Sequence, residues 1–355
     1  MNIFAKLRNR NSGLELLKIF SLIGILVMHM FGIVFHDENI SVFNLWVTIF
    51  INALFNVGVS CFALISGYFG LKLEFRRTAQ IWASIVFFSV ISGCIKFGIT
   101  RGGTDLLRGF FPIITKRNWY FSCYMVLLFL SGPLNYLISH FSRKQLKGFI
   151  AVMALWFVLV PTFFYFEIME DKGKGLMNII LLYLIGRYIR LYIDADETKI
   201  SRKRWGMIAI ACFLIISLLN GAITFIGGEY KSPFARDNSL FILVEALAIF
   251  MVFKGMKFES NVINFLGKST MSAFLMDSAI RGVILLFVDL HMYSDRAVLF
   301  PVVLSISFII YGVSIVVYLI YEMTLYRIIV LGIEWANDKF TSNSRIVQFL
   351  TEISE

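Results

Sequence analysis

The chain has 355 residues, of which 58% are hydrophobic and 16% are charged, with a mean hydropathy of +0.78. A soluble globular domain carries about 25% charged residues, so this composition excludes an ordinary soluble protein and indicates an integral membrane protein. The formal net charge of +10 raises nucleic acid as a partner, but the positions of the basic residues argue against it.

Ten apolar runs have the length that a bilayer-spanning helix requires. In chain order they cover residues 14–36, 44–69, 79–99, 119–140, 148–167, 175–193, 206–227, 238–256, 262–288 and 299–321. The first run is too long for the core of a signal peptide and contains Lys18 and His29, so we expect a retained helix. The sequence therefore predicts an all-α, polytopic membrane domain over residues 1–326.

Residues 327–355 form a predicted cytoplasmic amphipathic tail. Within it, Ile346, Phe349, Leu350 and Ile353 recur at helical spacing. If the N-terminus is cytoplasmic, 21 of the 33 Lys and Arg residues fall on the cytoplasmic side, nine on the outer side and three within helices. The positive-inside rule then places both termini in the cytoplasm and explains most of the excess charge without nucleic acid.

The first predicted helix carries a lysine and a histidine on one face. Lys18 and His29 are eleven residues apart, which is close to three turns and about 16 Å along the axis. Ionisable groups within a membrane are costly, so both are functional candidates. A neutral imidazole can accept a proton from a hydroxyl, which predicts His29 as a general base about two-thirds of the way across the helix. The alternatives are a packing histidine and a snorkelling lysine.

Other segments supply candidate binding residues. Arg76 and Arg77 open the third helix on the cytoplasmic side and suit the phosphates of a nucleotide-like ligand, unless they only set topology. Ser66 and Gly67 allow close helix approach, and Tyr68 follows them at the interface.

Two further helices carry polar or aromatic groups of interest. Trp119 and Tyr120 form an aromatic belt, and Tyr124 lies one turn deeper, where it can donate a hydrogen bond into a cavity or simply pack. Asp277 and Arg281 lie four residues apart in the ninth helix and can pair. The four cysteines are isolated in apolar runs, so we expect neither a disulfide framework nor a metal site.

Together these segments resemble the integral-membrane acyltransferase family 3, which includes bacterial O-acetyltransferases of surface polysaccharides. The residues from Glu15 to Lys18, followed by His29, resemble the family's Arg-ten-residues-His signature. Further similar segments follow in the same order: Ser66-Gly67-Tyr68-Phe69, Arg76-Arg77, Trp119-Tyr120 with Tyr124, Gly132-Pro133-Leu134-Asn135, and Asn264 to Thr270. Two positions depart from the pattern, because Lys18 replaces an arginine and Asp277 replaces a histidine.

The resemblance implies transfer of an acetyl or other acyl group from cytoplasmic acetyl-CoA to a hydroxyl of a cell-surface or exported saccharide or polyol. It implies a multi-pass protein of the bacterial cytoplasmic membrane, with no metal, in which Lys18, Arg76 and Arg77 bind acyl-CoA and His29 deprotonates the acceptor. The candidate pocket-lining residues are Glu15, Ser66, Tyr68, Trp119, Tyr120, Tyr124 and Asp277. The chain shows no Ser-His-Asp or Cys-His set, which favours direct transfer over an acyl-enzyme.

Two other functions remain open from the sequence. The first is a multi-pass saccharide transporter or flippase without acyl-transfer activity, in which Lys18 and His29 line a path. Transporters often have interrupted helices and internal repeats, whereas this chain has five prolines and no visible repeat. The second is an inactive relative that only binds the acyl donor, which the departures at Lys18 and Asp277 would fit. The sequence does not indicate an oligomeric state.

Overall fold

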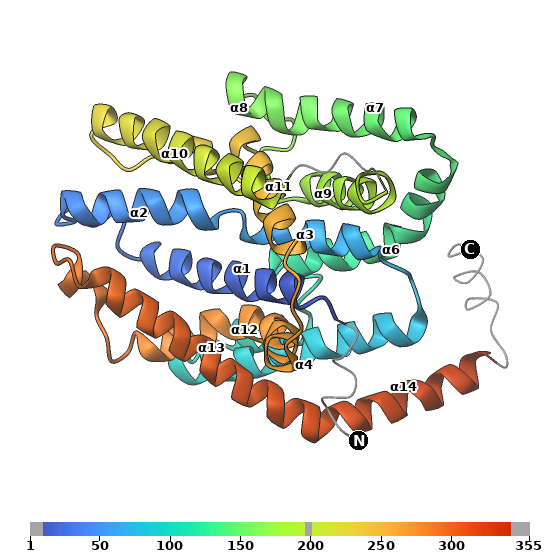
Figure 1. Cartoon of the computed structure of the whole chain (residues 1–355). Helices are drawn as coiled ribbons and strands as arrows, with labels where there is room; N and C mark the ends of the chain where they lie inside the picture. Colours follow the sequence, from blue (N-terminus) through green and yellow to red (C-terminus); the bar gives the residue numbers. More distant parts are fainter. Residues whose placement is uncertain (1–9, 196–200, 342–355) are drawn as a thin grey trace.

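The computed structural model describes residues 10–195 and 201–341, which form helices joined by loops with no strand among them (Figure 1). The first half contains α1 (Ser12–Phe31), α2 (Val42–Phe55), α3 (Gly58–Phe69), α4 (Phe75–Thr100), α5 (Gly103–Phe110), α6 (Trp119–His140), α7 (Arg143–Ala154) and α8 (Val160–Phe164). The second half contains α9 (Leu176–Tyr188), α10 (Arg202–Gly227), α11 (Leu240–Lys254), α12 (Asn261–Ile284), α13 (Leu299–Met323) and α14 (Leu325–Thr341). The all-helical prediction is confirmed.

Eight segments of the described chain are long and apolar enough to cross a membrane. They are Ser12–Phe31, Val42–Phe69, Phe75–Thr100, Trp119–His140, Arg143–Phe164, Leu176–Ile193, Arg202–Gly227 and Leu299–Met323. Each corresponds to one predicted run, which confirms a polytopic membrane protein. The remaining two runs correspond to the 15-residue α11 and to α12. Ten crossings and cytoplasmic termini stay predictions.

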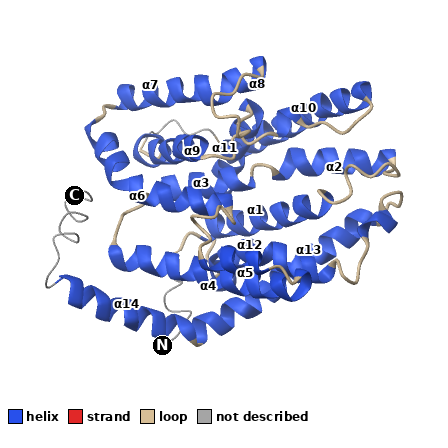
Figure 2. Cartoon of the chain, turned by 180° about the vertical axis from the view of Figure 1, so that it is seen from behind, coloured by secondary structure: helices blue, strands red, loops and turns tan. Residues whose placement is uncertain are grey.

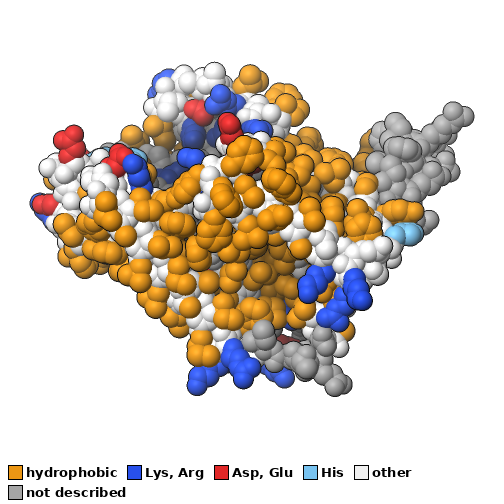
Figure 3. Space-filling view, turned by 90° about the horizontal axis from the view of Figure 1, so that it is seen from above, with side chains coloured by type: hydrophobic (Ala, Val, Ile, Leu, Met, Phe, Trp, Pro, Cys, Tyr) orange, Lys and Arg blue, Asp and Glu red, His pale blue; other side chains and the backbone are white. Residues whose placement is uncertain are grey.

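The outer surface of the bundle has the apolar character that lipid contact requires. A broad area of hydrophobic side chains separates charged side chains that gather at opposite margins (Figure 3). Helix α10 illustrates the cause, because Ile210, Leu214 and Leu218 recur every four residues and are all exposed. Such a stripe would be unfavourable in water but is satisfied by acyl chains.

Helix α1 lies in the middle of the bundle, between α2 and α3 on one side and α12 and α13 on the other (Figure 1). Leu14, Leu17, Leu22 and Leu26 are completely buried, so apolar packing surrounds the helix on several sides. The central position matters for function, because any polar side chain on α1 is held between neighbouring helices along most of its length.

Two predictions about helix continuity are wrong. The first helix ends at Phe31, five residues before the predicted limit, and a turn follows. The second run is broken at Asn56 and Val57 into α2 and α3. The break brings Gly58 so close to α1 that a Cβ atom there would lie 3.0 Å from Ser21 O, and Asn56 Nδ2 donates to Ala235 O at 2.5 Å. Interrupted helices therefore no longer distinguish an enzyme from a transporter.

The predicted tail begins as helix α14. The chain changes direction where α13 ends, and α14 then packs against α4 and the end of α13 (Figure 1). It exposes Ile328, Leu331 and Trp335 and pairs Glu334 with Arg76. These features are typical of a helix that lies in a membrane interface. The predicted apolar positions Ile346, Phe349, Leu350 and Ile353 lie outside the described residues.

Candidate active site

A cavity of ≈ 250 Å³ lies at the end of the bundle where α1, α4 and α12 begin. Its basic wall residues are Arg10, Lys18, Arg77 and Lys268. The aromatic residues that line it are Phe62, Phe69, Tyr120, Phe121, Tyr124 and Phe274. Under the predicted topology this end faces the cytoplasm, so the cavity combines positive charge near its mouth with an aromatic interior.

A buried carboxylate organises the basic side of the cavity. Lys18 Nζ donates to Glu15 Oε1 at 3.0 Å, and Arg10 Nε donates to the same oxygen at 2.9 Å. Glu15 is only 3% exposed, so it fixes both cations at the wall instead of lining the cavity itself. Because one carboxylate serves two cations, the wall keeps a net positive charge.

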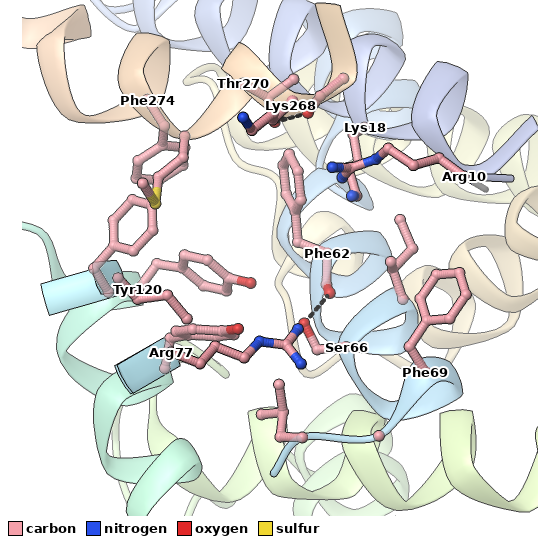
Figure 4. Close-up of a pocket in the computed structure, with 18 residues that line it drawn as sticks. Arg10, Lys18, Phe62, Ser66, Phe69, Arg77, Tyr120, Lys268, Thr270 and Phe274 are labelled. Carbon is pink, nitrogen blue, oxygen red and sulfur yellow. Dashed lines mark hydrogen bonds between the residues drawn. The ribbon is translucent and has the colours of Figure 1, made fainter. Parts of the chain in front are cut away.

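Arg77 approaches the cavity from the opposite side. Its guanidinium extends from the start of α4 toward Ser66 on α3, facing the wall that carries Lys18 and Arg10 (Figure 4). Ser66 Oγ donates to Phe62 O at 3.0 Å, so its hydroxyl hydrogen is already bonded to the backbone of α3. The cavity therefore offers cations on two facing walls.

Three predicted residues lie elsewhere. Arg76 pairs with Glu334 of α14, although its neighbour Arg77 lines the cavity. Trp119 packs edge-on against Tyr120, with ring centroids 6.2 Å apart. Tyr68 donates from its hydroxyl to Asp194 Oδ2 at 2.6 Å, beside a separate cavity of ≈ 430 Å³.

Asp194 joins this second cavity to a network of cations. Partial burial raises the pKa of Asp194, but hydrogen bonds from Lys254 and Tyr68 outweigh it and bring the pKa below its ordinary value. Asp194 is thus a firmly charged partner for Lys254 and, at 3.6 Å, for Arg190. This network orients Tyr68 away from the first cavity.

His29 lies in the last turn of α1, at the opposite end from Lys18. Its Nδ1 is 2.7 Å from Asp277 Oδ2 on α12, and the imidazole is 43% exposed while the carboxylate is 4% exposed. The predicted depth of His29 is wrong, because α1 ends two residues later at Phe31. His29 therefore lies near the outer surface under the predicted topology.

The partners of His29 determine which of its nitrogens can react. A carboxylate acceptor holds the imidazole proton on Nδ1, which leaves the Nε2 lone pair free to accept a proton. The predicted pair of Asp277 and Arg281 is confirmed at 3.5 Å, and Arg281 Nη1 also donates to His29 O at 2.9 Å. Asp277 does not line the cavity; it is the partner that orients His29.

Aromatic rings line the part of the cavity that is nearest to Asp277 along α12. Phe274 lies three residues before Asp277 on α12, so the two are about one helical turn or 5 Å apart along the axis. Its ring contacts Tyr120 and Phe121, with centroid distances of 5.9 and 5.5 Å. We call these three residues the aromatic wall. The cavity and the imidazole thus lie toward opposite ends of α1, and His29 does not line the cavity.

Sequence reasoning missed several residues of this arrangement. Lys268 lines the cavity and pairs with Glu322 of α13 at 2.7 Å, yet only its place in the late Leu-Gly-Lys-Ser-Thr segment hinted at a role. The His29–Asp277 pair joins residues 248 positions apart, and no local pattern signals such a pairing. The intramembrane carboxylate itself was the available clue.

Comparison with known proteins identifies the family. A family model described as an acyltransferase domain matches residues 11–335, which includes His29, Asp277 and all but one residue of the cavity wall. No curated protein and no solved structure matches the chain. The match covers nearly the whole chain, so this multi-pass membrane protein belongs to the acyltransferase family 3 and is an acyltransferase.

Proposed function

We propose that the protein transfers an acyl group from acyl-CoA, bound in the cavity, to a hydroxyl of a saccharide or polyol that reaches His29 from the other side of the membrane. One observation carries this proposal. A basic, aromatic cavity and a carboxylate-oriented imidazole lie toward opposite ends of the same central helix, and Phe274 of the cavity lies one helical turn before Asp277, the partner of the imidazole. Family membership favours this activity over the saccharide transporter considered from the sequence.

The cavity suits the acyl end of acyl-CoA. Lys18, Arg77 and Arg10 offer charge-assisted hydrogen bonds to phosphates at the mouth. Phe62, Tyr120 and the other rings offer apolar area for the pantetheine arm and the acyl group. A volume of ≈ 250 Å³ holds only part of acyl-CoA, so the nucleotide lies outside the cavity in this arrangement.

The proposed reaction needs no covalent enzyme intermediate. The acceptor hydroxyl gives its proton to His29 Nε2 while its oxygen attacks the thioester carbonyl carbon. The C–S bond then breaks, the acyl group stays on the acceptor oxygen, and the CoA thiolate takes the proton that the imidazolium gives up, which returns His29 to its neutral form. Asp277, hydrogen-bonded to Nδ1, stabilises the imidazolium formed in between. The small, uncharged acyl group is the part that passes the aromatic wall.

The test uses purified protein in nanodiscs with radiolabelled acetyl-CoA and a panel of saccharide and polyol acceptors. We expect wild type to label an acceptor, His29→Gln to lose about 10²–10⁴-fold in rate, and acetyl-CoA binding to stay unchanged. His140→Gln is the matched control, because His140 is an exposed histidine at the end of α6. If wild type labels nothing but moves a glycan across vesicles, the proposal is wrong.

A further inference from the structure

Helix α4 carries a lysine that the proposed reaction does not use. Lys96 lies one turn before the end of α4, at the same end of the bundle as His29, and is half-buried. Its ammonium makes no hydrogen bond and no ion pair with any residue that the structure describes. An unpaired lysine at the edge of a membrane segment is unfavourable unless a ligand or a headgroup satisfies it.

Two of the charged neighbours of Lys96, Asp277 and Arg281, also contact His29. Arg281, Asp277, Arg117 and Asp105 are the charged groups that act on its ammonium. Helix α4 packs directly on α12, and a Cβ atom at Gly282 would lie 3.4 Å from Ile99 Cδ1. Arg281, which precedes that glycine, donates to His29 O. Lys96 and Arg281 thus lie beside the end of α1 that carries the imidazole.

The charges around Lys96 do not balance. Lys96, Arg117 and Arg281 supply three positive charges against the carboxylates of Asp105 and Asp277, and Asp277 is already shared by His29 and Arg281. Arg117 donates to Asp105 O and, at 3.2 Å, to Ser92 Oγ, so it makes no ion pair through these bonds. In this set of charged groups the cations therefore outnumber the carboxylates by one.

The segment that packs over this region adds further basic residues. Helix α5 lies against α4 near α12 (Figure 2). The stretch from Arg101 to Arg117 contains Arg101, Arg108, Lys116 and Arg117 but only one acidic residue, Asp105. Arg108 also acts on Arg117. The excess of basic over acidic residues thus extends from Lys96 along the segment that follows it.

We propose that the acceptor is anionic: a carboxylate or phosphate group of the saccharide or polyol binds Lys96, next to Arg281, while its hydroxyl meets His29 Nε2. This inference rests on the proposed function and specifies its acceptor class. Ammonium and guanidinium groups hold such oxygens through charge-assisted hydrogen bonds. An excess of positive charge beside His29 also raises the local concentration of an anionic acceptor. A lipid anchor is the competing role for Lys96.

The test compares three acceptors of matched size in nanodiscs: a neutral oligosaccharide, a uronate oligosaccharide and a polyol phosphate. We expect wild type to prefer an anionic acceptor, and Lys96→Gln to raise its KM about tenfold without changing the KM for acetyl-CoA. Lys96→Arg keeps the preference. Lys172→Gln, at an exposed lysine of the loop before α9, changes nothing. The difference between the two anionic acceptors tells carboxylate from phosphate recognition.

One result of the transfer assay overturns this inference, and another leaves the decision to a binding measurement. If Lys96→Gln acylates charged and neutral acceptors as wild type does, Lys96 is a lipid anchor. If wild type shows no transfer to any acceptor, the proposed function fails, and equilibrium binding of the uronate and the polyol phosphate decides the site separately. Weaker binding by Lys96→Gln than by wild type and Lys172→Gln upholds the anionic site, and equal binding rejects it.

Discussion

The two ends of α1 are built in different ways. Around Lys18, side chains from α1, α3, α4, α6 and α12 enclose a cavity, and its positive charge comes from several residues. Around His29, reactivity depends on one hydrogen bond to one buried carboxylate, Asp277. In the proposed function, several residues therefore share the binding of the donor, whereas one pair of residues activates the acceptor. Substitutions at the two ends should differ accordingly in size and in the step they affect.

After the loss of His29 itself, the largest effect on this difference between the two ends should come from Asp277→Asn. The amide keeps the shape of the side chain but cannot stabilise an imidazolium, so we expect the acyl-transfer rate to fall about 10- to 100-fold. Acetyl-CoA binding should not change, because Asp277 does not line the cavity. Asp295→Asn, at an exposed aspartate of the loop before α13, is the control. Equal rates for Asp277→Asn and wild type would show that the pair does not act as a unit.

A smaller effect is expected from Lys18→Ala at the other end. Loss of one charge-assisted hydrogen bond to a phosphate should weaken acetyl-CoA binding about tenfold and leave the rate at saturation nearly unchanged. Lys18→Arg should bind almost as wild type does, since it keeps the charge. Binding assays on both variants, with Lys144→Ala as an exposed control on α7, measure this. Unchanged binding by Lys18→Ala would reduce Lys18 to a snorkelling anchor.

Phe274→Ala tests whether the aromatic wall keeps the two ends apart. Without the ring, water from the side of His29 can reach the thioester, so acetyl-CoA hydrolysis in the absence of acceptor should rise several-fold. Phe274→Leu should hydrolyse acetyl-CoA as slowly as wild type, because it keeps an apolar barrier. Release of free CoA is the measurement. The same slow hydrolysis by Phe274→Ala would mean that the wall is not the barrier.

The smallest effect concerns stability at the loop before α11, which belongs to neither end of α1. Burial raises the pKa of Asp237 to about 6, above its ordinary value near 4, so folding favours the protonated form. The free energy of unfolding should therefore be highest below about pH 4 and fall until about pH 6, by at most about 3 kcal/mol. Asp237→Asn should remove that fall and stabilise the protein at pH 7–8.

Melting temperatures in detergent from pH 4 to pH 8 measure this effect. Asp295→Asn is the control, since Asp295 is exposed and is not among the charged groups that act on Asp237. Acyl transfer at one fixed pH should be the same for Asp237→Asn and wild type, which separates this loop from the His29–Asp277 pair. Parallel melting curves for wild type and Asp237→Asn across the range would contradict the assignment.

The candidate site was predictable only where a local pattern carries the information. Ser66, Tyr120 and Tyr124 do line the cavity together with Lys18 and Arg77, whereas Arg76, Tyr68 and Trp119 do not. Arg76 and Arg77 show why. Consecutive residues on a helix point about 100° apart, so only one of them faces the cavity, and the sequence alone does not indicate which.

By itself, the sequence determined the membrane class, the apolar segments and the presence of Lys18 and His29 on one helix. Those properties follow from composition and spacing, which are local. Only the tertiary structure decided where α1 ends, that the second span breaks at Asn56 and Val57, and that Asp277 is the partner of His29. A contact between residues 248 positions apart arises from the packing of α1 on α12, and the local spacing of residues does not encode it.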